Sequence, residues 1–131
     1  MKMPVRIAIV LLSLAAIIGV IVFATVTRTT FENTNDPGRP TLMDLGAEWC
    51  PPCRQLQPGL KRLRDKYEGE INIQYHDVDT EEGKAFHTRY KATALPTLVY
   101  LDAEGNEVKR HVGFRSETQL ELDFRELGWT L

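Results

Sequence analysis

Cys50 and Cys53 are the residues of this 131-residue chain whose type and spacing most directly suggest chemistry. They are the chain's only cysteines, and Pro51 and Pro52 separate them in the stretch AEWCPPCRQLQP at residues 47–58. Two thiols at this spacing can form a reversible disulfide where a strand runs into a helix. The pattern therefore predicts a redox-active dithiol.

The start of a helix at this point gives the two thiols different expected roles. A helix N-terminus stabilises negative charge, so Cys50 should ionise readily, face the solvent and act as the nucleophile. Cys53 should be less exposed, because it lies one turn into the helix, and should resolve the mixed disulfide. Pro52 suits the first helical position and Pro51 is expected just outside helical geometry, so the prolines fix where the helix begins.

Two other interpretations of the cysteine pair are weaker. A purely structural disulfide would close a loop too short to gain much stability. A zinc site would need two further ligands, and His76, His87 and His111 do not have the spacing of metal ligands. We interpret these histidines as surface or edge residues and favour the redox pair.

The segments around the cysteines alternate between strand and helix patterns. Residues 41–47 are typical of a short apolar strand that leads into the cysteines. Beyond Cys53, one helical face would carry Leu56, Leu60, Leu63 and Tyr67. Further strands are expected at 71–79, 97–102 and 107–113, and further helices at 81–90 and after Ser116, which can act as an N-cap. This order predicts an α/β fold, a mixed sheet with helices on both faces.

The N-terminal segment has a different composition. Residues 7–26 carry no charge and follow Lys2 and Arg6. Such a helix is ~30 Å long, which is enough to cross the hydrocarbon core of a bilayer. Positive charges before the apolar run favour a cytoplasmic N-terminus at residues 1–6 and export of the rest. We therefore predict a transmembrane signal anchor at 7–26, with a cleaved signal peptide as the alternative.

The rest of the sequence divides into a linker and a folded domain. Residues 27–40 are polar and rich in turn formers, which predicts a linker, and residues 41–131 form the expected domain. A formal net charge of −2 gives no support for nucleic-acid binding. An exported domain would lie where disulfides persist. The prediction includes no cofactor and no metal.

Residues 41–127 resemble the thioredoxin family. The resemblance rests on DLGAEWCPPC, Pro58, DVD at 77–79, ALPT at 94–97 and HVGF at 111–114. It implies a thioredoxin-like domain at 41–131. It also implies that Pro96 is a cis-proline beside the disulfide.

The resemblance implies roles for the residues around the cysteines. The substrate-binding rim would consist of Trp49, Pro51, Leu95, Pro96 and Gly113. Leu95 would offer backbone hydrogen bonds to an extended substrate. Asp44 would be a buried carboxyl behind the cysteines, and because burial raises its pKa it could exchange a proton with Cys53. The alternative is an exposed aspartate at a strand edge.

The chain departs from the family pattern in several places. Gly46 stands where thioredoxins usually carry an aromatic residue, and Tyr75 where they carry a buried lysine that would partner Asp44. The polar stretch before the first expected strand is too short for the family's complete first strand and helix, so we expect a sheet of about four strands. Between Cys53 and Pro96 the chain lacks the insertions of the cytochrome-maturation and strongly oxidising branches.

These observations predict a membrane-anchored thiol–disulfide oxidoreductase whose domain lies on the extracytoplasmic side, in the periplasm or at the cell exterior. Its expected substrates are exported proteins with disulfides, which it would reduce. An exported reductase needs electrons from across the membrane, so a transmembrane thiol carrier is an expected partner. The alternatives are an oxidase or isomerase with the same site, and a binding or chaperone module of the same fold.

Overall fold

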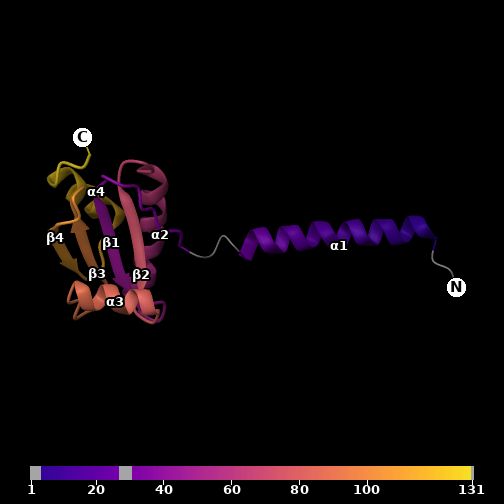
Figure 1. Ribbon diagram of the computed structural model, residues 1–131, viewed down its shortest axis with the longest axis horizontal. Helices are drawn as coiled ribbons and strands as arrows, with labels where there is room; N and C mark the ends of the chain where they lie inside the picture. Colours follow the sequence, from indigo (N-terminus) through magenta and orange to yellow (C-terminus); the bar gives the residue numbers. More distant parts are fainter. Residues whose placement is uncertain (1–3, 27–30, 131) are drawn as a thin grey trace. The chain divides into compact units, whose positions relative to one another are not determined.

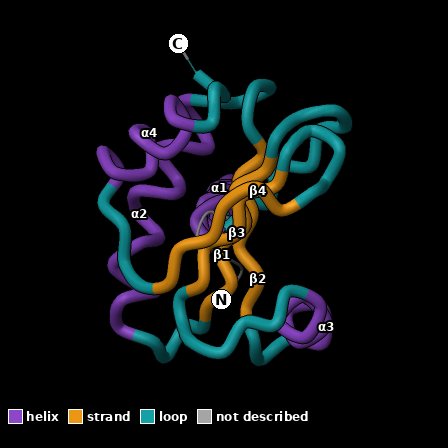
Figure 2. The backbone as a smooth tube through the Cα atoms, turned by 90° about the vertical axis from the view of Figure 1, so that its left-hand side faces the viewer, coloured by secondary structure: helices purple, strands orange, loops and turns teal. Residues whose placement is uncertain are grey.

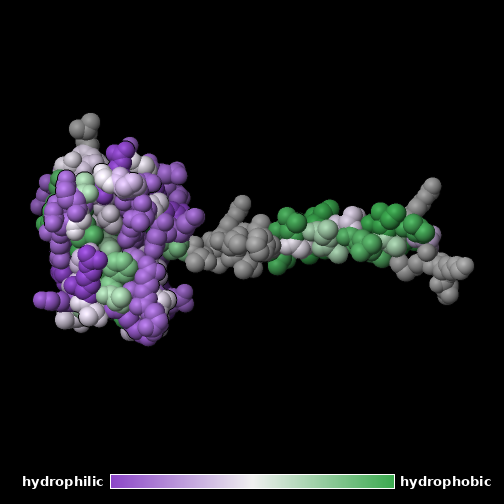
Figure 3. Space-filling model, viewed as in Figure 1, coloured by the Kyte–Doolittle hydropathy of each residue, from purple (hydrophilic) through white to green (hydrophobic). Residues whose placement is uncertain are grey.

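The computed structural model describes residues 4–26 and 31–130 and divides into two units, Met1–Phe31 and Glu32–Leu131 (Figure 1). The first unit contains helix α1 (Val5–Val26), whose described side chains are largely apolar and exposed (Figure 3). Within the part of the chain that is described, no helix is both long enough and apolar enough to cross a membrane. The predicted transmembrane anchor is therefore not supported by the structure.

The second unit is built on a mixed sheet of four strands, as the sequence predicts (Figure 1). The strands are β1 (Thr41–Gly46), β2 (Asn72–Asp77), β3 (Thr97–Leu101) and β4 (Glu107–Val112). Their order across the sheet is β2-β1-β3-β4, with β1 parallel to β2 and the other neighbours antiparallel. The central position of β1 places its C-terminal end, and the cysteine loop that follows, in the middle of one sheet edge.

Helices cover both faces of this sheet. They are α2 (Pro51–Lys66), α3 (Glu81–Arg89) and α4 (Glu117–Glu126). Figure 2 shows α2 and α4 on one side of the sheet and α3 on the other. Side chains alternate along a strand, so Met43 and Leu45 face α3, whereas Leu42, Asp44 and Gly46 face α2 and α4.

The helices form where the sequence patterns predict them. On α2 the apolar stripe of Leu56, Leu60 and Leu63 is fully buried. On α4, Ser116 is the N-cap and exchanges hydrogen bonds with Gln119 in a capping box, which satisfies backbone donors at the helix start. The helix starts therefore agree with local capping chemistry.

The outer edge of β2 is occupied by part of the predicted linker. The side-chain amide of Asn33 donates to the carbonyl oxygen of Tyr75 (3.1 Å) and accepts from its N–H (2.7 Å). Thr34 makes the equivalent pair with Ile73, using its backbone N–H as donor (3.2 Å) and its hydroxyl oxygen as acceptor (2.8 Å). These residues belong to the second unit, and residues 27–30 of the predicted linker lie outside the described residues.

The sequence predicts three surface or edge histidines, whereas the structure buries two of them, of which His76 lies on the outer strand β2. His76 on β2 is 5% exposed and His87 on α3 is 8% exposed. The His76 ring packs on Phe86 with a centroid separation of 4.0 Å. Burial lowers the pKa of both imidazoles, which favours their neutral forms. His111 on the edge strand β4 is partly exposed, as expected.

Candidate functional site

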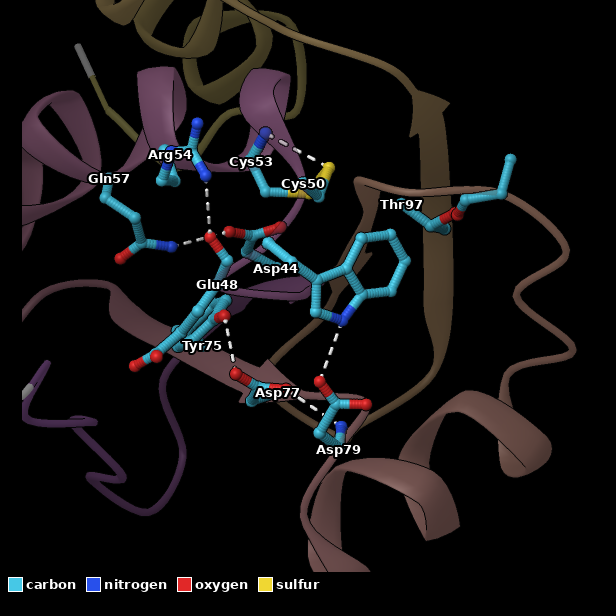
Figure 4. Close-up of a disulfide and its surroundings, with 12 residues drawn as sticks. Asp44, Glu48, Cys50, Cys53, Arg54, Gln57, Tyr75, Asp77, Asp79 and Thr97 are labelled. Carbon is cyan, nitrogen blue, oxygen red and sulfur yellow. Dashed lines mark hydrogen bonds between the residues drawn. A yellow bond between two sulfur atoms is a disulfide. The ribbon is translucent and has the colours of Figure 1, made fainter.

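The candidate site is a disulfide between Cys50 and Cys53 at the N-terminus of α2, as Figure 4 shows. Cys50 is the N-cap, with extended backbone, and Pro51 and Pro52 occupy the first two helical positions. Backbone N–H groups in the first turn of a helix have no acceptor within the helix. Proline has no N–H group, so neither residue leaves a donor without a partner. The helix thus begins at Pro51, one residue earlier than predicted.

The backbone N–H of Cys53 donates to the Sγ atom of Cys50 over 3.4 Å. This donor, together with the helix N-terminus, stabilises negative charge on the Cys50 sulfur once the disulfide is reduced. The two Cα atoms are 5.3 Å apart, within the usual range for a disulfide. The local geometry therefore supports reversible closing of the bond.

Cys50 is more covered than the sequence suggests. In the disulfide form it is 4% exposed and Cys53 is 1% exposed, so neither sulfur faces the solvent broadly. The half-buried side chains of Val78 and Leu95 pack against the two cysteines and Ala47. An incoming disulfide must reach Cys50 between these apolar neighbours.

Among the residues predicted to form the rim, Trp49 and Pro51 flank Cys50 in the chain and Leu95 packs against the cysteines. The Leu95–Pro96 peptide bond is cis, as the family resemblance implies. The N–H of Gly113 donates to the carbonyl oxygen of Pro96 (2.8 Å), and its φ of +101° is a conformation that favours glycine. This bond fixes the end of β4 beside the cis-proline.

Trp49 and Pro51 are the exposed members of the predicted rim. Trp49 is 63% exposed, and its indole N–H donates to Oδ2 of Asp79 over 2.8 Å (Figure 4). Trp49 is therefore a surface residue beside the disulfide, not a core tryptophan. Asp79 lies within the DVD stretch that carried the resemblance, but its bond to Trp49 was not predicted.

Asp44 lies on β1 behind the cysteines and is fully buried, as predicted. Burial raises its pKa from 3.8 to about 8, because the charged carboxylate loses its hydration. Its Oδ2 atom accepts a hydrogen bond from the side-chain amide of Gln57 (3.0 Å), and its Oδ1 atom has no partner among the described residues. A carboxyl in this state can hold or release a proton near neutral pH.

Gly46 and Tyr75, the two departures from the family pattern, meet beside Cys53. A Cβ atom on Gly46 would lie 3.1 Å from Cε2 of Tyr75 and 3.4 Å from both Cβ and Sγ of Cys53. The Tyr75 ring therefore fills the space next to Gly46, and its hydroxyl donates to Oδ2 of Asp77 (3.2 Å). An aromatic ring from β2 and the Cys53 side chain thus both lie against Gly46.

Sequence reasoning did not identify Gln57 as a site residue. The available signal was its position four residues after Cys53, which places both side chains on one helical face toward β1. Without the sheet register, nothing indicated that Asp44 would lie opposite. Within the described part of the chain, no group of histidine, cysteine or acidic side chains is arranged to hold a metal ion.

The fold and the site together define a thioredoxin fold that carries a disulfide-forming C-x-x-C pair beside a cis-proline. A sequence model of the thioredoxin family matches residues 22–126. This chain belongs to the thioredoxin family.

Similar proteins agree with this assignment. The chain is 33% identical over 92 residues to a protein of Synechocystis sp. named "Thiol:disulfide interchange protein TxlA homolog", covering 70% of this chain and 51% of that protein. It is 34% identical over 90 residues to the H-type thioredoxin of Fagopyrum esculentum, covering 69% and 74% of the two chains. The chain thus spans about half the length of the Synechocystis relative.

Solved structures show the same likeness. Thioredoxin of Fasciola hepatica superposes with a TM-score of 0.60 at 32% identity, covering 69% of this chain and 82% of that one. A thioredoxin-like protein of Clostridium perfringens gives a TM-score of 0.64 at 30% identity, covering 72% and 75%. The shared part corresponds to the second unit in size.

Proposed function

We propose that this protein is a thiol–disulfide oxidoreductase that reduces disulfides of exported proteins through Cys50 and Cys53. The observation that carries the proposal is the disulfide at the N-terminus of α2, with the cis-proline on one side and the buried Asp44 carboxyl on the strand behind. A structural disulfide would have no need of a buried proton acceptor. The relative named as a thiol:disulfide interchange protein gives further support.

The reaction would proceed in two exchange steps. The Cys50 thiolate attacks one sulfur of the substrate disulfide, so a Cys50–substrate bond forms and the other substrate sulfur leaves as a thiolate that takes up a proton. Cys53 then loses its proton and attacks the Cys50 sulfur. The Cys50–Cys53 bond forms, the second substrate sulfur leaves and is protonated, and two electrons have passed to the substrate.

Substrate binding would use the rim around the disulfide. The exposed ring of Trp49, the residue before Cys50, and the partly buried Leu95, which packs against the cysteines, would provide apolar contact. From the family resemblance, the backbone of Leu95 would hydrogen bond to an extended segment of the substrate protein. A peptide that carries its disulfide in an extended segment fits this arrangement.

The direction of the reaction is tested by the redox potential of the Cys50–Cys53 couple. The full-length chain is equilibrated with glutathione buffers, and the fraction of disulfide is read by thiol alkylation. A potential of about −270 mV supports a reductase, whereas a value of about −120 mV would establish the oxidase alternative. If Cys50 and Cys53 form no disulfide in any of the buffers, the result would favour the binding or chaperone module. The double variant Cys50→Ser/Cys53→Ser gives the alkylation baseline.

The extracytoplasmic location and the transmembrane thiol carrier form the second part of the proposal. Their support is the uncharged stretch at residues 7–26, which follows Lys2 and Arg6. If the full chain is anchored, it should remain in the membrane fraction after carbonate washing, and Cys50 should react with an impermeant thiol reagent from outside. Recovery of a shorter soluble chain would instead support the signal-peptide alternative, and labelling from the inside alone would exclude both.

A further inference from the structure

Gln57 is the polar side chain of α2 that contacts the buried carboxyl of Asp44. It lies one helical turn beyond Cys53 and is half-buried, and its Nε2 atom donates to Oδ2 of Asp44 over 3.0 Å. Figure 4 shows the Gln57 amide directed at the Asp44 carboxyl. Two residues after Asp44 on β1, and on the same face of the strand, Gly46 lies against Cys53 of α2. The Gln57–Asp44 pair therefore lies next to the Gly46–Cys53 pair along the interface between β1 and α2.

The other neighbours of Asp44 offer it no positive charge. In the sheet, Asp44 pairs with Tyr75 on β2 and with Leu98 on β3. The Tyr75 hydroxyl donates to Asp77. Glu48, in the loop after β1, is a negative charge in this region, and the Arg54 guanidinium on α2 donates to the Glu48 carbonyl oxygen (3.2 Å) and not to Asp44 (Figure 4). Among the described residues, no lysine or arginine forms an ion pair or hydrogen bond with Asp44.

An amide differs from a cationic partner in what it can offer a carboxyl. The Gln57 side chain has an NH₂ group that donates to a carboxylate and a carbonyl oxygen that accepts from a protonated carboxyl. Rotation of the terminal amide exchanges the positions of the NH₂ donor and the carbonyl acceptor. A lysine or arginine has donors alone, so it would hold Asp44 in its charged form.

We propose that Gln57 is a positioning residue for thiol–disulfide exchange: its amide pairs with Asp44 in both protonation states and keeps the carboxyl able to accept and return the Cys53 proton. This inference rests on the proposed function. In the resolving step, the Asp44 carboxylate takes the proton of the Cys53 thiol, and the resulting thiolate attacks Cys50. The bond from Cys50 to the substrate breaks, and the substrate sulfur leaves. The amide then rotates to accept from the protonated carboxyl.

The first test follows the titration of Asp44 in the full-length chain, by NMR of its labelled side-chain carboxyl carbon. Gln57→Lys should lower the Asp44 pKa by about 1–3 units, because it adds a positive charge in direct contact. Gln57→Leu should raise it, because both hydrogen bonds are lost and the one donated to the charged carboxylate is stronger than the one accepted from the neutral carboxyl. Gln55→Leu makes the same chemical change at an exposed position of α2 and should leave the titration unchanged.

The second test follows Gln57 itself and the reaction. The side-chain amide signals of Gln57 should shift with the same midpoint as Asp44 and should not titrate in Asp44→Asn. The pH profile of the resolving step, measured by release of a thiol from a preformed mixed disulfide on Cys50, should move with the Asp44 midpoint in each variant.

Unchanged Asp44 titration in both Gln57 variants would overturn the proposal, as would a pH profile that stays fixed while the midpoint moves. Failure of the proposed function looks different. In that case the wild-type chain exchanges no disulfide at any pH, whereas the coupled titration of Gln57 and Asp44 is still measurable.

Discussion

The ring of Tyr75 occupies the space beside Gly46: its Cε2 atom lies 3.1 Å from the position that a Cβ on Gly46 would take. Strand β2 therefore supplies the aromatic surface that the family usually supplies from the position of Gly46 itself. Tyr75 also stands where the family pattern carries a lysine. The two departures from the family pattern thus lie in contact with each other, and within the described part of the chain no lysine or arginine pairs with Asp44.

This exchange predicts coupling between positions 46 and 75. Gly46→Ala should lower the free energy of unfolding by about 1–3 kcal/mol, because the new methyl group crowds the Tyr75 ring and Cys53. In a Tyr75→Ala background the same change should cost clearly less. Urea unfolding of the four proteins in this cycle measures the difference. Additive costs would show that the ring does not restrict position 46.

The roles of the cysteines predict different trapping behaviour. Cys53→Ser should accumulate mixed disulfides on Cys50, because attack on a substrate remains possible while resolution does not. Cys50→Ser should trap almost none. Non-reducing gel electrophoresis after incubation with a disulfide-containing protein compares the two variants. Equal trapping would contradict the assignment of Cys50 as the nucleophile.

Asp44 predicts a specific dependence of stability on pH. Its folded-state pKa of about 8 lies above the unfolded value of 3.8, so the folded protein binds the extra proton between these values. The contribution of Asp44 to the free energy of unfolding is therefore fully present below about pH 4. It falls by up to about 1.4 kcal/mol per pH unit as the pH rises toward 8.

Asp44→Asn should remove this decrease in the free energy of unfolding with rising pH. The oxidised variant should then be more stable than the oxidised wild type at pH 8. Urea unfolding at pH 5 and pH 8 compares the two proteins. His76 and His87, with lowered pKa values, act in the opposite sense below about pH 6.5, so the difference between wild type and variant isolates Asp44. Asp65→Asn at an exposed position serves as the control. Parallel pH dependence in wild type and Asp44→Asn would contradict a raised pKa.

Loss of the hydrogen bond from Trp49 to Asp79 should slow the reaction with protein substrates and should change the free energy of unfolding little. Asp79→Ala frees an exposed indole, so the free energy of unfolding should change by less than about 1 kcal/mol. Attack on protein disulfides should slow about two- to tenfold, the value of one hydrogen bond that orients the ring. Asp79→Asn keeps an acceptor and should retain most of the rate. If Asp79→Ala reacts at the wild-type rate, the orientation of Trp49 has no part in the reaction.

Local sequence patterns predicted the order of helices and strands, and the family resemblance implied a sheet of about four strands and the burial of Asp44. These features follow from periodicity, capping and a family motif that spans the site. The contacts of Asp44 with Gln57 and of Trp49 with Asp79 could not be predicted, because they depend on how α2 and β2 lie against β1. The same holds for Asn33 and Thr34, whose polar stretch has no periodicity and binds β2 through hydrogen bonds.

The bonds made by Asn33 and Thr34 bear on how this protein associates with other chains. Unpaired backbone groups on an outer strand are the usual template for edge-to-edge aggregation. On β2, the outward groups of Ile73 and Tyr75 are already taken. The opposite outer strand, β4, is protected instead by the charges of Glu107, Lys109 and Arg110. Salt screens charge and leaves the β2 bonds in place, so self-association at high ionic strength would begin along β4.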